Sequence, residues 1–330
     1  MKSTLASTSI AGSSKAGPAR LARPVAIGAL VAVVALGLAG ARAQVQLPEY
    51  RYGIKVELVS LFATVQDRSG KLVRGLGRDD FVIYDDGVPQ KISQFSAEYI
   101  PLSVLILLDC SSSMRGKKLE YAKRALGHFL DRLRPSDEAM LVTFQTKPRV
   151  VQGYTDRFDS IRRALKKLDG NGSTALYDAI AAALDESRRA QNRRKSLLLI
   201  SDGINNYGNA RLADTVVRLQ RSGLELFAIG LESNLPEDME ERAVTRAVLD
   251  QLSRAAGGEA FVVSDAHDLG RICSTISDRM HNQYAFAYYP PPSPEGRWHP
   301  VRVETRVPGL RVIPSKKGYF PGPAAEVHPE

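Results

Sequence analysis

The stretch that decides the fold is LSVLILLDCSSSM, residues 102–114. Leu102–Leu108 is a continuous run of mostly apolar residues, which is typical of a strand that is buried on both faces of a parallel sheet. A helical pattern follows it, so Asp109, Ser111 and Ser113 occupy a loop at the carboxyl end of a central strand. Open α/β sheets bind ligands at that end. Carboxylate and hydroxyl oxygens favour a hard cation, namely Mg²⁺, Mn²⁺ or Ca²⁺.

Short apolar runs alternate with helical patterns between residues 101 and 282. This alternation predicts a doubly wound α/β domain with a mostly parallel, six-stranded sheet flanked by helices. The connection between Phe144 and Arg149 is too short for a parallel crossover, so an antiparallel edge strand is expected there. The predicted strands are Leu102–Leu108, Ala139–Phe144, Arg149–Gly153, Ser196–Ser201, Leu224–Gly230 and Ala260–Val263. The helical patterns cover residues 116–134, 158–168, 174–190, 210–222, 237–256 and 266–280.

Both flanks of this domain have β character. Residues 54–98 alternate as strands do, with a hairpin signal at Asp86-Gly87. Residues 283–320 return to β patterns around a Pro-rich loop. The two flanks suggest a small, discontinuous β-sandwich into which the α/β domain is inserted. The predicted boundaries are 1–43 for a leader, 44–100 and 283–320 for the flanks, 101–282 for the α/β domain and 321–330 for a disordered tail.

The first 43 residues predict export. They contain five basic and no acidic residues, and the run Val25–Ala41 holds only Ala, Val, Ile, Leu and Gly. Ala41-Arg42-Ala43 fits the small-x-small cleavage site of a signal peptide. The run has 17 residues, close to the lower limit for a membrane span, so an uncleaved anchor formed by residues 25–41 is the alternative. Either way, the rest of the chain is expected in the periplasm, at the cell surface or secreted.

The charge balance argues against a nucleic-acid partner. The chain has a net charge of +9, but beyond residue 43 it carries 40 Lys plus Arg against 36 Asp plus Glu, a net of +4. Such a surface is only mildly basic, unlike that of a polyanion binder. Cys110 and Cys273 are the only cysteines. They form either a disulfide or two small buried side chains, and the sequence leaves both readings open.

Two further loops add oxygen donors. The loop Gly170–Thr174 lies between two helical patterns, and Ser201-Asp202-Gly203 follows another buried strand. Each feature also has a simple structural explanation, since Ser113 and Thr174 can cap helices and Asp-Gly is a common turn. All three loops, however, are predicted at the same edge of one parallel sheet, which brings their oxygens together.

These positions together resemble the metal-ion-dependent adhesion site of the von Willebrand factor type A domain family. That family pairs a D-x-S-x-S loop after the first strand with a Thr in a second loop and an Asp in a third. The matching residues are Asp109, Ser111, Ser113, Thr174 and Asp202, and the resemblance covers roughly residues 101–282. It implies a Mg²⁺ site, with Mn²⁺ or Ca²⁺ as alternatives, at which the two Asp supply charge and the three hydroxyls set geometry. It also implies a protein partner that presents an Asp or Glu carboxylate, and thus a role in adhesion or envelope assembly.

The surroundings of the motif refine this resemblance. The β-rich flanks resemble those of an exported bacterial subfamily, often from Acidobacteria, whose function is poorly defined. Animal adhesion receptors of the family often carry acidic residues just beyond the motif, where they form a second metal site. Here Arg115, Lys117 and Lys118 stand in that region, which disfavours a second cation. These basic residues either steer an acidic partner or form a solvated helix start.

An enzyme is the main alternative, namely a phosphohydrolase with Asp109 as its nucleophile. Many such enzymes place a second Asp two residues further on as general acid, but here that position is Ser111, which cannot take the role. Neither a G-x-S-x-G nucleophile motif nor a P-loop occurs in the chain. A binding module without enzymatic activity is therefore expected.

Overall fold

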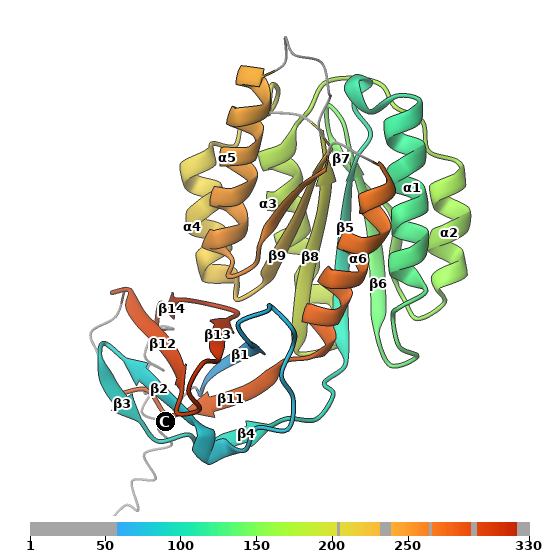
Figure 1. Cartoon of the computed structure of the whole chain (residues 1–330). Helices are drawn as coiled ribbons and strands as arrows, with labels where there is room; N and C mark the ends of the chain where they lie inside the picture. The colour runs from blue at the N-terminus through green and yellow to red at the C-terminus, as the bar shows by residue number, and fades with distance from the viewer. Residues whose placement is uncertain (1–57, 203–204, 232–238, 264–265, 292–295, 322–330) are drawn as a thin grey trace, which may run out of the picture. The chain divides into compact units, whose positions relative to one another are not determined.

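The computed structural model describes residues 58–202, 205–231, 239–263, 266–291 and 296–321 (Figure 1). The strands are β1 (Val59–Gln66), β2 (Phe81–Asp85), β3 (Val88–Gln90), β4 (Gln94–Ser96), β5 (Leu102–Asp109), β6 (Glu138–Phe144), β7 (Pro148–Thr155), β8 (Arg194–Ser201), β9 (Glu225–Leu231), β10 (Ala260–Val263), β11 (Tyr284–Tyr288), β12 (His299–Thr305), β13 (Arg311–Pro314) and β14 (Gly318–Tyr319). The α-helices are α1 (Lys117–Leu130), α2 (Phe158–Lys166), α3 (Leu176–Glu186), α4 (Leu212–Ser222), α5 (Met239–Ala255) and α6 (Ala266–His281). Short 3-10 turns are η1 (Arg78–Asp80), η2 (Ser112–Met114) and η3 (Ser187–Arg189).

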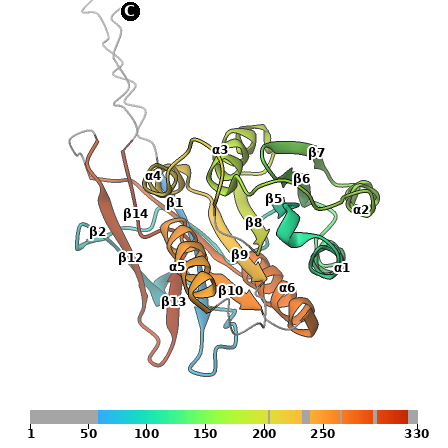
Figure 2. The same cartoon turned by 90° about the horizontal axis from the view of Figure 1, so that it is seen from above.

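The central sheet has the predicted α/β arrangement. Its strand order is β10-β9-β8-β5-β6-β7, and all neighbours are parallel except β7, which pairs antiparallel with β6. Every residue of β5, β6 and β9 is buried, which accounts for their mainly apolar composition. Helices α1, α2 and α6 pack on one face, and α3, α4 and α5 pack on the other (Figures 1 and 2). The doubly wound fold is therefore confirmed.

The strand order also positions the candidate site. The chain leaves β5 toward β6 on one side and later returns through β8 on the other side, so the order of connections reverses between β5 and β8. Ligand crevices form at such switch points, beyond the carboxyl ends of the strands. Leu108 on β5 lies opposite Ile200 on β8. The loops that begin after Asp109 and Ser201 therefore start side by side.

The β-rich flanks form two four-stranded sheets, with orders β13-β1-β11-β4 and β14-β12-β2-β3. Each sheet combines strands from both sides of the α/β domain in the sequence. Their apolar side chains share one core, in which the ring of Phe81 lies 5.0 Å from that of Tyr284 and 4.9 Å from that of Phe286. These sheets agree with the expected sandwich. The domain boundaries stay predictions, and residues 1–43 and 322–330 lie outside the described residues.

Cys110 and Cys273 are both free and buried in the core cluster between β5 and the helices α1 and α6. Burial raises the pKa of each thiol to about 12, so neither is a ready nucleophile. Of the two open readings, the structure shows the two small buried side chains. Within the described residues, no helix combines the length and the apolar composition that a membrane crossing requires.

Candidate metal centre

Asp109 is the buried anchor of the site. Its side chain lies at the end of β5 with no exposed surface. One carboxylate oxygen accepts the Ser111 amide at 2.8 Å, and the other accepts the Ser201 hydroxyl at 2.5 Å. Burial raises the pKa of Asp109 to about 6, although the hydrogen bonds from Ser201 and Ser111 partly oppose this shift. An anion held in such a place gains from a nearby cation.

The side-chain oxygens of three more predicted ligands, Ser111, Ser113 and Asp202, lie close to one another. The hydroxyl oxygens of Ser111 and Ser113 lie 3.1 Å apart, and the Ser113 hydroxyl donates to Oδ1 of Asp202 at 2.7 Å. Neighbouring ligands in a magnesium octahedron, each about 2.0–2.1 Å from the ion, stand about 3 Å apart. The spacing and the all-oxygen chemistry of these side chains therefore fit a hard divalent cation.

The loop with Thr174 is tied to the same edge of the sheet through its backbone. The Asn171 amide donates to the Cys110 carbonyl at 2.8 Å, and the Ser112 amide donates to the Gly172 carbonyl at 3.0 Å. A Cβ atom at Gly170 would lie only 2.9 Å from the carbonyl oxygen of the Ser111 residue, so the close approach of these two loops requires glycine.

Thr174 itself is buried and is held by Asn206. Its amide donates to the Asn206 side-chain oxygen at 2.8 Å, and its carbonyl accepts the Asn206 amide at 3.1 Å. These bonds place Thr174 beside the loop that begins at Asp202. The structure thus brings Asp109, Ser111, Ser113 and Asp202 into one hydrogen-bonded cluster, with Thr174 joined to it through the backbone. Their role as metal ligands stays a prediction.

Sequence reasoning missed two contacts of the basic segment that follows the motif. The Lys118 ammonium contacts Oδ2 of Asp202, whose side chain is fully buried. The Arg115 guanidinium donates to the Gly170 carbonyl at 2.8 Å. These two residues are therefore neither purely steering charges nor a solvated helix start. Arg115 holds the second loop in place, and Lys118 neutralises a predicted metal ligand. No local pattern in the sequence indicates such pairings.

Replacing Lys118 by Met is expected to tighten Mg²⁺ binding about tenfold, or about 1.4 kcal/mol, because the ammonium competes with the ion for Asp202. The same change should lower the stability of the metal-free protein, since it leaves a buried carboxylate without its cation. Calorimetric titration with Mg²⁺ and thermal melting in EDTA measure the two effects. Lys117→Met is the matched control, because Lys117 is the exposed neighbour of Lys118 on α1. Weaker Mg²⁺ binding by Lys118→Met would contradict the competition.

Other candidate residues are part of the structure's framework or lie elsewhere. Five basic residues occur between positions 188 and 195 of the sequence. They do not form one exposed patch, because Arg194 is buried and Arg189 pairs with Glu186 at 3.0 Å. Within the described residues, one group of acidic and histidine side chains lies close enough together to hold a metal, and it belongs to the flanking sheets: Asp85, Asp86 and His299.

Known proteins resemble the α/β part of the chain. The model of the von Willebrand factor type A domain matches residues 103–275. An uncharacterized protein of Synechocystis sp. is 28% identical over 187 residues, which make up 56% of this chain and 42% of that protein. Human inter-alpha-trypsin inhibitor heavy chain H4 is 27% identical over 184 residues, which make up 51% of this chain and 19% of that protein. The chain therefore spans less than half the length of these relatives.

Two solved structures also match part of the chain. The vWF domain of the type V pili tip protein Mfa5 from Porphyromonas gingivalis has a TM-score of 0.46 at 14% identity, over 55% of this chain and 95% of that one. A von Willebrand factor type A protein from Catenulispora acidiphila has a TM-score of 0.47 at 15% identity, over 80% of this chain and 74% of that one. The family model matches residues 103–275, which make up more than half of the chain. The protein therefore belongs to the von Willebrand factor type A domain family.

Proposed function

We propose that this protein is an exported, non-enzymatic binding module that captures a carboxylate of a protein partner through a divalent cation. Asp109, Ser111, Ser113, Thr174 and Asp202 hold the cation, which is Mg²⁺ in the first instance. The observation that carries the proposal is the set of hydrogen bonds at the sheet edge that links Asp109 through the Ser111 amide, and the Ser111 and Ser113 hydroxyls, to Asp202.

The donor set explains why the site would bind a partner. Of the five predicted ligands, only Asp109 and Asp202 carry a charge that offsets that of a divalent ion, because the other three are neutral hydroxyls. Lys118 already pairs with Asp202. The ion supplies a positive centre to which a further carboxylate binds favourably. Asp or Glu on a protein partner provides that group. Adhesion or envelope assembly is the role that fits this chemistry, and nothing in it calls for a nucleic acid.

Export is supported by the leader in the sequence, with its basic start, its apolar run and the small-x-small motif Ala41-Arg42-Ala43. Periplasmic, surface-bound and secreted forms share this signal, and an anchor formed by residues 25–41 would keep the chain at the membrane. Fractionation of expressing cells, followed by the mass of the isolated chain, tests the proposal. A chain found whole in the cytoplasm would contradict it.

The double variant Asp109→Ala with Ser111→Ala is expected to lose all stabilisation by Mg²⁺. In the unaltered protein, Mg²⁺ at a hundred times its dissociation constant should add about 2.7 kcal/mol to the free energy of unfolding. Thermal melting with Mg²⁺ and with EDTA measures this difference. The same variant should also lose Mg²⁺-dependent capture of partners from an envelope extract.

Ser112→Ala is the control for this experiment, because Ser112 lies in the same turn with an exposed side chain and is not a predicted ligand. It should keep the full response to Mg²⁺. An undiminished Mg²⁺-dependent shift in the double variant would refute the assignment of the site.

A phosphohydrolase with Asp109 as nucleophile remains the alternative to test. Both oxygens of Asp109 already accept hydrogen bonds, and the carboxylate has no exposed surface, which does not suit a nucleophile. Phosphatase turnover by the purified chain that disappears in Asp109→Asn would favour the enzyme over the binding module.

A further inference from the structure

A second group of ligand-type side chains lies at one end of the sheet β14-β12-β2-β3. Asp85 is the last residue of β2, Asp86 follows in the turn, and His299 is the first residue of β12. The two strands pair antiparallel, with Asp85 opposite Val301 and the Asp86 amide donating to the Pro300 carbonyl at 3.0 Å. The pairing therefore brings together residues that are more than 200 positions apart in the sequence.

These three side chains are close enough to share an ion. The Nδ1 atom of His299 lies 2.9 Å from Oδ2 of Asp86 and 3.7 Å from Oδ1 of Asp85. One ligand atom from each residue lies within 4.8 Å of the others. Ligands about 2.0–2.1 Å from a metal stand about 3.0 Å apart in an octahedron and about 3.4 Å apart in a tetrahedron. The two measured distances, 2.9 and 3.7 Å, lie near these values, and no pair of ligand atoms is more than 4.8 Å apart.

The surroundings of Asp85 hold its carboxylate in one orientation. Its side chain has no exposed surface, and Oδ2 accepts the hydroxyls of Tyr288 at 2.9 Å and Tyr319 at 2.8 Å. Oδ1, which points toward the imidazole, accepts no hydrogen bond within the described part of the chain. The ring of Tyr319 also stacks on that of His299, with centroids 5.2 Å apart. Metal ligands are commonly oriented in this way by hydrogen bonds to the atom that does not bind the metal.

A buried carboxylate oxygen without a donor is costly, and a cation at this place would remove the cost. Asp86 and Arg297 are partly exposed, so an ion can reach the three side chains from solvent. Asp86 has 27% of its side chain exposed, and its oxygen also pairs with Arg297 at 2.6 Å. Arg297 is 59% exposed, so its guanidinium can turn into solvent when an ion takes its place.

We propose that Asp85, Asp86 and His299 form a second metal site, distinct from the one at Asp109, that takes a divalent transition-metal ion, Zn²⁺ in the first instance. The imidazole decides the class of metal, because a nitrogen ligand favours Zn²⁺ over the Mg²⁺ that suits an all-oxygen site. The ion clamps the end of β2 to the start of β12. It thus fastens the flank that precedes the α/β domain in the sequence to the flank that follows it.

Zinc binding is tested in the background of the Asp109→Ala, Ser111→Ala double variant, so that failure of the first site does not affect the result. Calorimetric titration with Zn²⁺ should give one equivalent bound, unaffected by millimolar Mg²⁺. Adding Asp86→Asn should weaken binding about 100-fold, and His299→Gln should weaken it at least as much.

If His299→Gln fails to fold, Asp86→Asn still tests the proposal. Asp86 has a φ of 50°, a backbone conformation that Asn tolerates well. Asp79→Asn changes an exposed carboxylate of the same flank and is the matched control, which should bind Zn²⁺ as the parent does. The proposal is overturned if the parent binds no Zn²⁺ below about 10 μM, or if Asp86→Asn binds Zn²⁺ as tightly as the parent does.

Discussion

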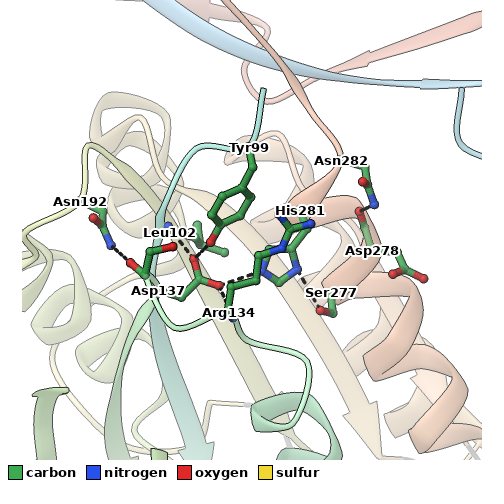
Figure 3. A network of polar contacts seen from close by, with 10 residues as sticks. Tyr99, Leu102, Arg134, Asp137, Asn192, Ser277, Asp278, His281 and Asn282 are labelled. Atoms are coloured by element: carbon green, nitrogen blue, oxygen red, sulfur yellow. Dashed lines mark hydrogen bonds and ion pairs between the residues drawn. The ribbon is translucent and has the colours of Figure 1, made fainter. Parts of the chain in front are cut away.

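Replacing Asp137 by Asn is expected to lower the free energy of unfolding by about 3–5 kcal/mol, as breaking a buried charged network does. The carboxylate lies between the start of β5 and the end of α6 (Figure 3). One oxygen accepts the Tyr99 hydroxyl and, at 2.9 Å, the Leu102 amide. The other accepts the Arg134 amide at 2.8 Å and lies 2.9 Å from Nε2 of His281. An amide side chain cannot accept on both sides, so it leaves buried donors without partners.

The pH dependence of stability offers a second readout. Burial raises the pKa of Asp137, but the hydrogen bonds from His281 and Tyr99 outweigh it and hold the pKa below 3.8. Because the folded state has the lower pKa, the stabilisation is present above pH 3.8 and is lost as the pH falls through the pKa of the folded protein. The difference in free energy of unfolding between the original protein and Asp137→Asn should therefore become smaller as the pH falls below 3.8.

Urea unfolding at pH 7 and at pH 3 measures both effects. Asp131→Asn is the control, because its carboxylate is 63% exposed and pairs at the surface with Arg162. It should cost no more than about 1 kcal/mol. A loss of less than 1 kcal/mol in Asp137→Asn, equal to that of the control, would show that the network does not hold β5 and α6 together.

The fold could be predicted largely from local patterns. A strand that is buried on both faces is mostly apolar, so β5, β6 and β9 stand out as mainly apolar runs. The candidate site follows from the same logic, since parallel strands end at a common edge of the sheet. Asp109 and Asp202 could thus be placed together before any contact was known. The prediction of the edge strand β7 rested on its short connection alone, and it is confirmed.

Contacts between distant side chains could not be predicted in this way. The pairing of Lys118 with Asp202 joins residues on α1 and after β8 that are 84 positions apart in the sequence, and no local pattern encodes it. Arg194 belongs to a run of basic residues that suggests an exposed surface, yet it is buried as the first residue of β8. Asp85 and His299 meet only because two flanks of the chain complete one sheet. Each case depends on tertiary structure, namely on how strands pair or where a helix packs, and not on the local sequence.

Asp109→Asn is expected to stabilise the metal-free protein at pH 7 by about 1–3 kcal/mol. The pKa of Asp109 rises from 3.8 to about 6 in the folded state, which corresponds to about 3 kcal/mol of cost for the ionised form. Because the folded pKa is the higher one, this cost is absent below pH 3.8 and complete above pH 6. Asn removes the charge and keeps the hydrogen bonds, since its oxygen can accept the Ser111 amide and its amino group can donate to the Ser201 hydroxyl.

The same substitution should abolish stabilisation by Mg²⁺, because it removes one of the two carboxylates of the predicted site. A gain in stability in EDTA together with a loss of the response to Mg²⁺ is the signature of a residue kept for binding at the expense of stability. Thermal melting of both proteins in EDTA and in Mg²⁺ separates the two effects. Ser112→Ala again serves as the control in the same loop. If the free energy of unfolding of Asp109→Asn in EDTA were instead more than about 1 kcal/mol lower than that of the original protein, Asp109 would be a structural hydrogen-bond acceptor. A bound cation would then not be the reason for its buried charge.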